Sequence, residues 1–149
     1  MQSDWIWMNG KFIPWDEANI HVTAHALHYG TSVFEGIRAY STPDGPAIFR
    51  LHDHTNRLIK GCKILRLELP YTQETLNTAI IKTVQKNQHT TCYIRPLAFR
   101  GSGKLGVDGR QNPVEVVIFS FEWGAYLGTE ALEQGVDVQV TSWQRMAPN

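Results

Sequence analysis

The chain has 149 residues, of which 42% are hydrophobic and 19% are charged, and its length is typical of a single domain. Fourteen basic residues balance fourteen acidic ones, and a formal net charge of zero argues against a nucleic-acid binder with a basic face. No apolar run approaches the ~20 residues that a membrane helix needs. The N-terminus lacks a signal core, and Cys62 and Cys92 form no metal or disulfide pattern. We therefore expect a cytoplasmic protein with two buried thiols, and neither a nucleic-acid nor a membrane partner.

The first fifty residues predict two β-hairpins. Residues 5–8 and 11–14 flank Asn9-Gly10, the residue pair preferred in a type I′ turn. Residues 31–40 are rich in aromatic and β-branched side chains, which predicts one strand, and a proline–glycine turn at 41–45 precedes a returning arm at 46–49.

Two helices follow in the pattern. Residues 51–63 place Leu51, Leu58, Ile59 and Cys62 on one helical face. Thr72 is a suitable N-cap for a second helix that ends near Asn87. The apolar stripe of this second helix consists of Leu76, Ala79, Ile80 and Val84.

The second half predicts three strands and two connections. Residues 91–99 form a strand that contains Pro96, which favours an edge strand or a bulge. After a glycine-rich loop at 100–113, residues 114–121 form a strand, residues 123–135 a connector, and residues 136–140 an alternating, half-buried strand.

This element order predicts an α+β fold with a small, mainly antiparallel sheet and two helices, because strands and helices do not alternate as they do in βαβ units. We expect residues 1–122 to form the small domain and residues 123–135 to connect it to a second domain. Residues 136–149 would then be the first strand of that larger domain, the remainder of which would lie beyond Asn149.

The segment Gly101–Gly106 matches the dinucleotide-binding pattern G-x-G-x-x-G. That motif places its phosphate at the N-terminus of a helix, and the seven residues before the next strand leave no room for one. A Walker A loop is excluded as well, because Leu105 stands where Ser or Thr would hold magnesium. A flexible loop over a site, or a plain surface loop, is the better interpretation.

Histidines are grouped at His21, His25 and His28, and such groups can bind metal. No Asp, Glu or Cys lies among them, so capping, turn-forming or core histidines are favoured and no metal site is predicted. The two cysteines lack a context that would lower their pKa, so we interpret them as core thiols.

Tyr93 and Arg95 are two residues apart in a predicted strand and therefore point to the same face. A phenol and a guanidinium on one face can receive a carboxylate. The alternative, a surface arginine that pairs with an acidic neighbour, remains open.

These residues lie in motifs that resemble the branched-chain amino-acid aminotransferases, which are class IV aminotransferases of the fold-type IV pyridoxal-phosphate enzymes. The resemblance covers nearly the whole chain. It runs through HALHYGTSVFEGIRAY, FRLHDHTNRL, YIRPL, EWGAYLG and ALEQGVDVQVTSW. D-amino-acid aminotransferases and aminodeoxychorismate lyases share the fold, but they do not typically carry FEGIRAY and YIRP together.

The resemblance implies a role for individual residues. Arg57 would bind the phosphate of pyridoxal 5′-phosphate, and Arg95 would take the side-chain carboxylate of glutamate. The wall of the substrate pocket would contain Phe34, Gly36, Trp123 and Tyr126. Tyr29 and Val107 would reach into the pocket of a neighbouring subunit, which implies a homodimer or a higher homo-oligomer.

The implied activity is transamination of leucine, isoleucine or valine with 2-oxoglutarate, which gives branched-chain 2-oxo acids and glutamate. In this family a lysine holds the cofactor as a Schiff base, and its position would lie beyond Asn149. None of the six lysines present matches it, so the 149 residues alone are expected to be inactive. Another class IV enzyme, a non-enzymatic binding or assembly domain, and a nucleotide-binding module through residues 101–106 are the alternatives.

Overall fold

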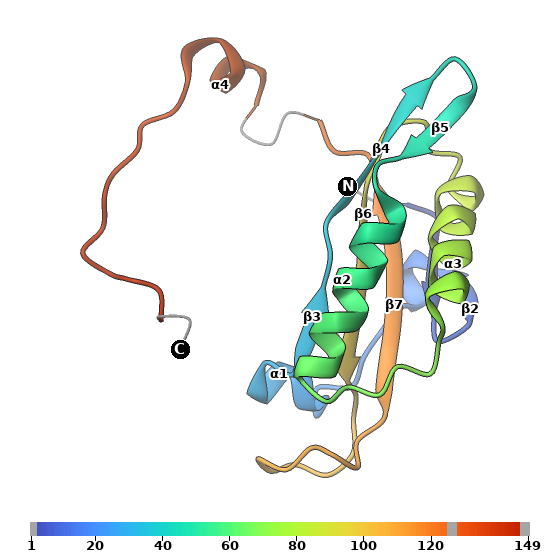
Figure 1. Ribbon diagram of the computed structural model, residues 1–149, viewed down its shortest axis with the longest axis vertical. Coiled ribbons are helices and arrows are strands. Elements are labelled where there is room, and N and C mark those ends of the chain that lie inside the picture. The colour runs from blue at the N-terminus through green and yellow to red at the C-terminus, as the bar shows by residue number, and fades with distance from the viewer. Residues whose placement is uncertain (1–2, 125–127, 147–149) are drawn as a thin grey trace.

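The computed structural model describes residues 3–124 and 128–146 of the chain and shows one seven-stranded sheet with two long helices on one face (Figure 1). The strands are β1 (Trp5–Met8), β2 (Lys11–Pro14), β3 (Ser32–Phe34), β4 (Ile37–Thr42), β5 (Gly45–Ile48), β6 (Cys92–Arg100) and β7 (Val114–Phe121). The helices are the 3-10 turn η1 (Trp15–Glu17), α1 (His25–Tyr29), α2 (Leu51–Ile64), α3 (Gln73–Lys86) and α4 (Thr129–Gln134). The strand order is β2-β1-β7-β6-β4-β5, β3 also pairs with β6, and every pairing is antiparallel. The predicted α+β class is therefore confirmed.

The first hairpin and the two long helices follow the sequence closely. Met8 pairs with Lys11 across a turn in which Asn9 and Gly10 both have positive φ, as a type I′ turn requires. The Thr72 side chain accepts a hydrogen bond from the backbone N–H of Thr75 at 3.2 Å and caps α3 as predicted.

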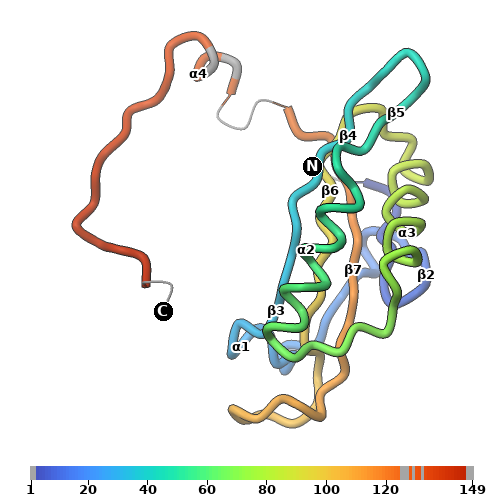
Figure 2. Tube along the Cα trace, in the orientation of Figure 1, coloured from blue at the N-terminus to red at the C-terminus, as the bar shows by residue number. Residues whose placement is uncertain are grey.

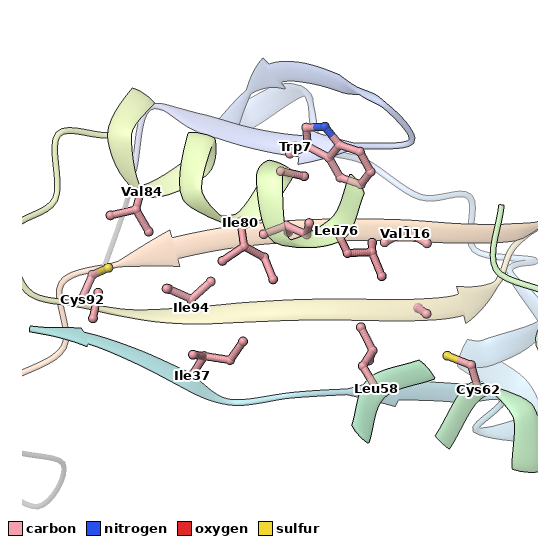
Figure 3. Packing of buried hydrophobic residues seen from close by; sticks show 14 of the residues in the cluster. Trp7, Ile37, Leu58, Cys62, Leu76, Ile80, Val84, Cys92, Ile94 and Val116 are labelled. Atoms are coloured by element: carbon pink, nitrogen blue, oxygen red, sulfur yellow. The ribbon is translucent and has the colours of Figure 1, made fainter. Parts of the chain in front are cut away.

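The core lies between the helices and the inner face of the sheet (Figure 3). Leu58 and Cys62 of α2, together with Leu76, Ile80 and Val84 of α3, meet Ile37, Ile94 and Val116 of the central strands. These side chains are almost fully buried, so the helices are held mainly by apolar packing on the sheet.

The prediction of one strand over residues 31–40 is wrong, because β3 and β4 are separated at Glu35 and Gly36. Both strands pair with β6 in the same register, and the break falls opposite Pro96. The Glu35 N–H donates to the Pro96 carbonyl at 3.0 Å. Proline has no N–H, so the reciprocal bond to the Glu35 carbonyl cannot form and the ladder is interrupted there.

The expectation that Pro96 marks an edge or a bulge is also wrong. β6 is central and pairs with β7 over eight residues without a bulge. Pro96 is tolerated because its missing donor faces the interruption between β3 and β4.

The segment after β7 differs most from expectation. The connector at 123–135 contains the short helix α4, which the sequence pattern did not predict. Residues 136–140 form no strand, and the side chains of Val138 and Val140 are 85% and 94% exposed. Figure 2 shows this stretch running apart from the sheet. An alternating sequence becomes a strand only when it has a neighbour to pair with, and the described part of the chain provides none.

Candidate functional site: an aromatic cluster and two arginines

The outer face of the sheet, opposite the helices, carries several of the predicted substrate residues. Along β6 the side chains alternate, so Ile94 and Ala98 are buried under the helices while Tyr93 and Arg95 point the other way. Phe34 lies on the same outer face, because it pairs with Leu97 of β6.

Arg95 lies between two aromatic rings. Its Nε and Nη2 donate to the Tyr93 hydroxyl oxygen at 3.1 and 2.6 Å. Its Cζ lies 4.2 Å from the centroid of the Phe34 ring, within the range of a cation–π contact. Among the described residues no carboxylate pairs with Arg95. The alternative of a surface ion pair is therefore not what this part of the structure shows.

Gly36 and Trp123 complete this group from two other segments. A Cβ at position 36 would lie 3.1 Å from Tyr93 Cζ and closer still to the hydroxyl oxygen, so any larger residue here would displace the Tyr93 phenol. The Trp123 ring packs edge-on against Tyr93 with the centroids 4.6 Å apart. Arg38, which pairs with Tyr93 across β4 and β6, donates from Nη2 to the Trp123 carbonyl at 3.3 Å.

An apolar groove continues from this cluster along the outer face, with a volume of about 590 Å³. Phe121 belongs to both, because it lines the groove and packs 5.3 Å from Tyr93 and 5.4 Å from Trp123 between ring centroids. The groove is also lined by Ile6, Met8, Trp15, Ala18, Ile20, Ala26, Leu27, Ser32, Leu97, Phe99, Val117 and Phe119.

Arg57 lies on α2 and makes a bidentate ion pair with Glu35. Its Nε and Nη2 donate to Glu35 Oε1 and Oε2, each at 2.5 Å. His54, one helical turn earlier, lies with Nδ1 2.9 Å from Glu35 Oε2. Burial alone would raise the pKa of Glu35, but the hydrogen bonds from Arg57 and His54 outweigh it and lower that pKa. Glu35 is therefore a carboxylate near neutral pH.

Tyr29 and Val107 form a second group, organised around the buried His25. The rings of His25 and Tyr29 lie 4.4 Å apart, and His25 Nε2 lies 2.9 Å from the carbonyl oxygen of Gly106. His25 Nδ1 contacts the Thr31 hydroxyl at 2.9 Å, which holds the ring between the helix and the loop. Val107 is 89% exposed at the loop tip.

The loop between β6 and β7 is built around Asn112 rather than open. The buried amide of Asn112 donates to the carbonyls of Gly101 and Lys104 and accepts from the Lys104 N–H, at 3.1 to 3.2 Å. The structure describes every residue from 101 to 113, and this stretch contains no helix. The loop therefore lacks the helix N-terminus that a dinucleotide site requires.

The remaining histidines and cysteines have local roles. His21 contacts the Thr23 hydroxyl and His28 contacts the Val22 carbonyl. Burial raises the pKa of both Cys62 and Cys92 to about 11, as is expected of core thiols. In the ranges that the structure describes, no helix has the length and apolar character to cross a membrane.

The structure thus brings Phe34, Gly36, Tyr93, Arg95 and Trp123 together. Arg57 does not touch this cluster directly and is linked to it through Glu35 and Gly36. Tyr126 lies outside the described residues. Sequence reasoning did not identify Glu35 and His54 as partners of Arg57. Glu35 and His54 are 19 residues apart, and no helix or strand period predicts a contact at that spacing, because the contact joins the break between β3 and β4 to helix α2.

The chain belongs to the class IV aminotransferase family, whose model, described as amino-transferase class IV, matches residues 32–149. Curated relatives that match the chain include two bacterial branched-chain-amino-acid aminotransferases. The branched-chain-amino-acid aminotransferase of Escherichia coli strain K12 is 48% identical over 149 residues, which are 99% of this chain and 48% of that protein. The counterpart from Pseudomonas aeruginosa is 44% identical over 140 residues, 94% of this chain and 46% of that protein. The chain therefore spans about half the length of the curated relatives it matches.

Solved structures agree with this assignment. A crystal structure of the E. coli branched-chain amino acid aminotransferase superposes with a TM-score of 0.94 and 48% identity, and covers 99% of this chain and 49% of that one. A branched-chain amino acid aminotransferase from T.th., complexed with N-(5′-phosphopyridoxyl)-L-glutamate, has a TM-score of 0.81 and 52% identity, and covers 83% of this chain and 42% of that one.

Proposed function

We propose that the protein carrying this chain is a branched-chain amino-acid aminotransferase that uses pyridoxal 5′-phosphate. It would transfer the amino group of leucine, isoleucine or valine to 2-oxoglutarate and release branched-chain 2-oxo acids and glutamate. Membership of the class IV family and the names of the relatives support this proposal. The T.th. structure supports it as well, because that protein is in complex with a phosphopyridoxyl-glutamate adduct, which joins a cofactor to one of the two substrate classes.

The observation that carries the proposal is the environment of Arg95. Its guanidinium lies over the Phe34 ring, is held by the Tyr93 hydroxyl, and has no carboxylate partner among the described residues. A pocket that accepts both aliphatic and acidic side chains needs an apolar wall and one carboxylate receptor at its margin. The aromatic wall then suits a leucine side chain, while Arg95 takes the second carboxylate of glutamate or 2-oxoglutarate.

The residues present fit the phosphate of the proposed cofactor. Arg57 is 71% exposed on its side chain, and Glu35 occupies only Nε and one N–H of Nη2. Nη1 and the second N–H of Nη2 remain for an anion, and a guanidinium edge matches two phosphate oxygens. When bound, pyridoxal phosphate supplies the electron sink that makes the Cα proton of an amino acid removable.

We also propose that Tyr29 and Val107 contribute to the pocket of a second subunit, so that the active form is at least a homodimer. Val107 is exposed at the end of a loop that Asn112 and His25 hold in shape, which suits a side chain presented to a neighbour. Residues 1–122 would form the small domain and residues 123–135 the connector to the larger one. A cytoplasmic location would follow from this metabolic role.

The test is an assay of the purified full-length protein with leucine and 2-oxoglutarate, in which glutamate and the 2-oxo acid of leucine should appear in equal amounts. Turnover of a D-amino acid in place of leucine would reject the proposal in favour of a D-amino-acid aminotransferase. Cleavage of a carbon–nitrogen bond without a need for a 2-oxo acid would indicate a lyase. Absence of any affinity for pyridoxal phosphate would indicate a binding or assembly domain.

A further inference from the structure

Glu35 occupies an unusual position for a carboxylate. It is 4% exposed and lies in the gap between β3 and β4, where its N–H is bound to the Pro96 carbonyl. A buried carboxylate without partners is costly, so its two oxygens must be satisfied. Arg57 and His54 satisfy them, and both come from the same face of α2.

The Glu35–Gly36 dipeptide also joins the two layers of the molecule. β3 and β4 keep one register against β6, so side chains continue to alternate through the break. Glu35 therefore faces α2, while Gly36 faces the outer side of the sheet and contacts Tyr93. The Glu35–Gly36 unit thus places Glu35 beside Arg57 and places Gly36 against Tyr93, which is the hydrogen-bond partner of Arg95.

We infer that Glu35 is a positioning residue, which sets the guanidinium of Arg57 in the orientation that binds the cofactor phosphate. This inference rests on the proposed function. Arg57 has four rotatable side-chain bonds and is mostly exposed, so without a partner its guanidinium would sample many orientations. The two bonds to Glu35 fix both its position and the tilt of its plane, and they leave Nη1 without a hydrogen bond among the described residues, on a side chain that is mostly exposed.

Glu35 also has a second effect, which would change the affinity for phosphate in the opposite direction, so an experiment can distinguish the two. The carboxylate compensates the positive charge of Arg57, so its removal would strengthen the attraction of a bare cation for phosphate. If orientation dominates, loss of the carboxylate weakens phosphate binding. If charge compensation dominates, the same loss tightens it.

The experiment measures equilibrium binding of pyridoxal 5′-phosphate and of pyridoxal, which lacks the phosphate, to the full-length protein. In Glu35→Gln we expect affinity for pyridoxal phosphate to fall at least tenfold while affinity for pyridoxal changes less than threefold. If Glu35 had only a structural role, its replacement would weaken the binding of both ligands alike. Arg57→Ala should likewise reduce the ratio of the affinity for pyridoxal phosphate to the affinity for pyridoxal. The double variant should reduce this affinity ratio no further than Arg57→Ala alone.

Three outcomes separate the ideas. If Arg57→Ala leaves the affinity ratio unchanged, the phosphate role proposed for Arg57 is wrong, and the inference falls with it. If Arg57→Ala lowers the ratio but Glu35→Gln leaves it unchanged or raises it, only the positioning role is overturned. If Glu35→Gln does not fold, Glu35→Asp serves instead, since it keeps the charge but is one methylene too short to reach both nitrogens. An unchanged ratio in that variant would equally contradict the inference.

Discussion

Gly36 lies against the phenol of Tyr93 so closely that a methyl group at position 36 would overlap the hydroxyl. Tyr93 in turn orients Arg95 through two hydrogen bonds, so a displaced phenol moves the proposed carboxylate receptor. We expect Gly36→Ala to lower kcat/KM for leucine and 2-oxoglutarate by about 100-fold, because a misplacement of about 1 Å can cost that much. Steady-state kinetics of the full-length protein would measure it.

The matched control for this substitution is Gly124→Ala. Among the described residues no atom lies within 4 Å of a Cβ built on Gly124, and its φ is not in the left-handed region, so a methyl group is accommodated there. Equal losses in the two variants would show that the contact between Gly36 and Tyr93 has no special importance.

Replacement of Arg95 by glutamine should separate the two substrates. The KM for 2-oxoglutarate is expected to rise about 10- to 100-fold, since a hydrogen bond to a charged group contributes ~1.5–3 kcal/mol. The KM for leucine should change less than about threefold, because an aliphatic side chain does not use the guanidinium. Arg50→Gln, an exposed arginine paired with Asp53, is the control and should alter neither value. A uniform rise for both substrates would contradict the receptor role.

The loop between β6 and β7 should depend on Asn112. Asn112→Ala removes the amide that bridges Gly101 and Lys104, and leaves buried backbone groups unpaired at ~1–3 kcal/mol. We predict faster trypsin cleavage after Lys104, followed by mass spectrometry of the fragments. Asn19→Ala, which removes an exposed side chain, should be cleaved at the wild-type rate. Resistance of Asn112→Ala would mean that the loop is held by other contacts.

His89 should make stability depend on pH between neutral and mildly acidic conditions. Burial lowers the pKa of His89 from 6.5, although Glu122 and Asp4 partly oppose the shift. The unfolded chain therefore binds a proton that the folded chain does not bind at the same pH. The stability present above pH 6.5 is lost as the pH falls below that value.

Urea unfolding at about pH 7.5 and at about pH 5.5 would test this sign. The free energy of unfolding should fall less between the two pH values in His89→Gln than in the wild type. His21→Gln, which replaces an exposed histidine, should keep the wild-type difference. An equal fall in His89→Gln and wild type would exclude His89 as the cause.

The 149 residues alone are predicted to form no specific covalent bond with the cofactor. The six lysines lie on β2, α2, α3 and the β6–β7 loop, and within the described ranges none contacts the cluster around Tyr93 and Arg95. Borohydride reduction of this chain after addition of pyridoxal phosphate should leave only scattered, substoichiometric adducts. One adduct per chain on a single lysine would refute the prediction.

Periodicity was sufficient for α2 and α3, because burial of one helical face decides these elements locally, and the Asn9-Gly10 pair was sufficient for the first hairpin. It could not place the break at Glu35, since that break arises from a missing N–H on Pro96, which is about sixty residues away along the chain. Nor could it show that residues 136–140 have no pairing partner within the described ranges, because strand formation depends on a neighbour rather than on alternation alone.

For the candidate site, strand alternation indicated Tyr93 and Arg95, and the motif resemblance indicated Arg95, Phe34, Gly36 and Trp123. The fold brings these five residues together, and their roles in binding stay predictions. The partners of Arg57 were not predicted. A carboxylate in the FEGIR segment and a histidine on a helix show no relationship until the strand break turns Glu35 towards α2.

The internal hydrogen bonds of the β6–β7 loop have an evolutionary consequence. Asn112 and His25 hold the loop by its backbone, at Gly101, Lys104 and Gly106, while the side chains of Leu105 and Val107 are exposed and take no part in those bonds. Side chains at the tip can therefore be exchanged at little cost to folding. A lineage could alter what this loop presents to its surroundings by single substitutions, without rebuilding the framework that supports it.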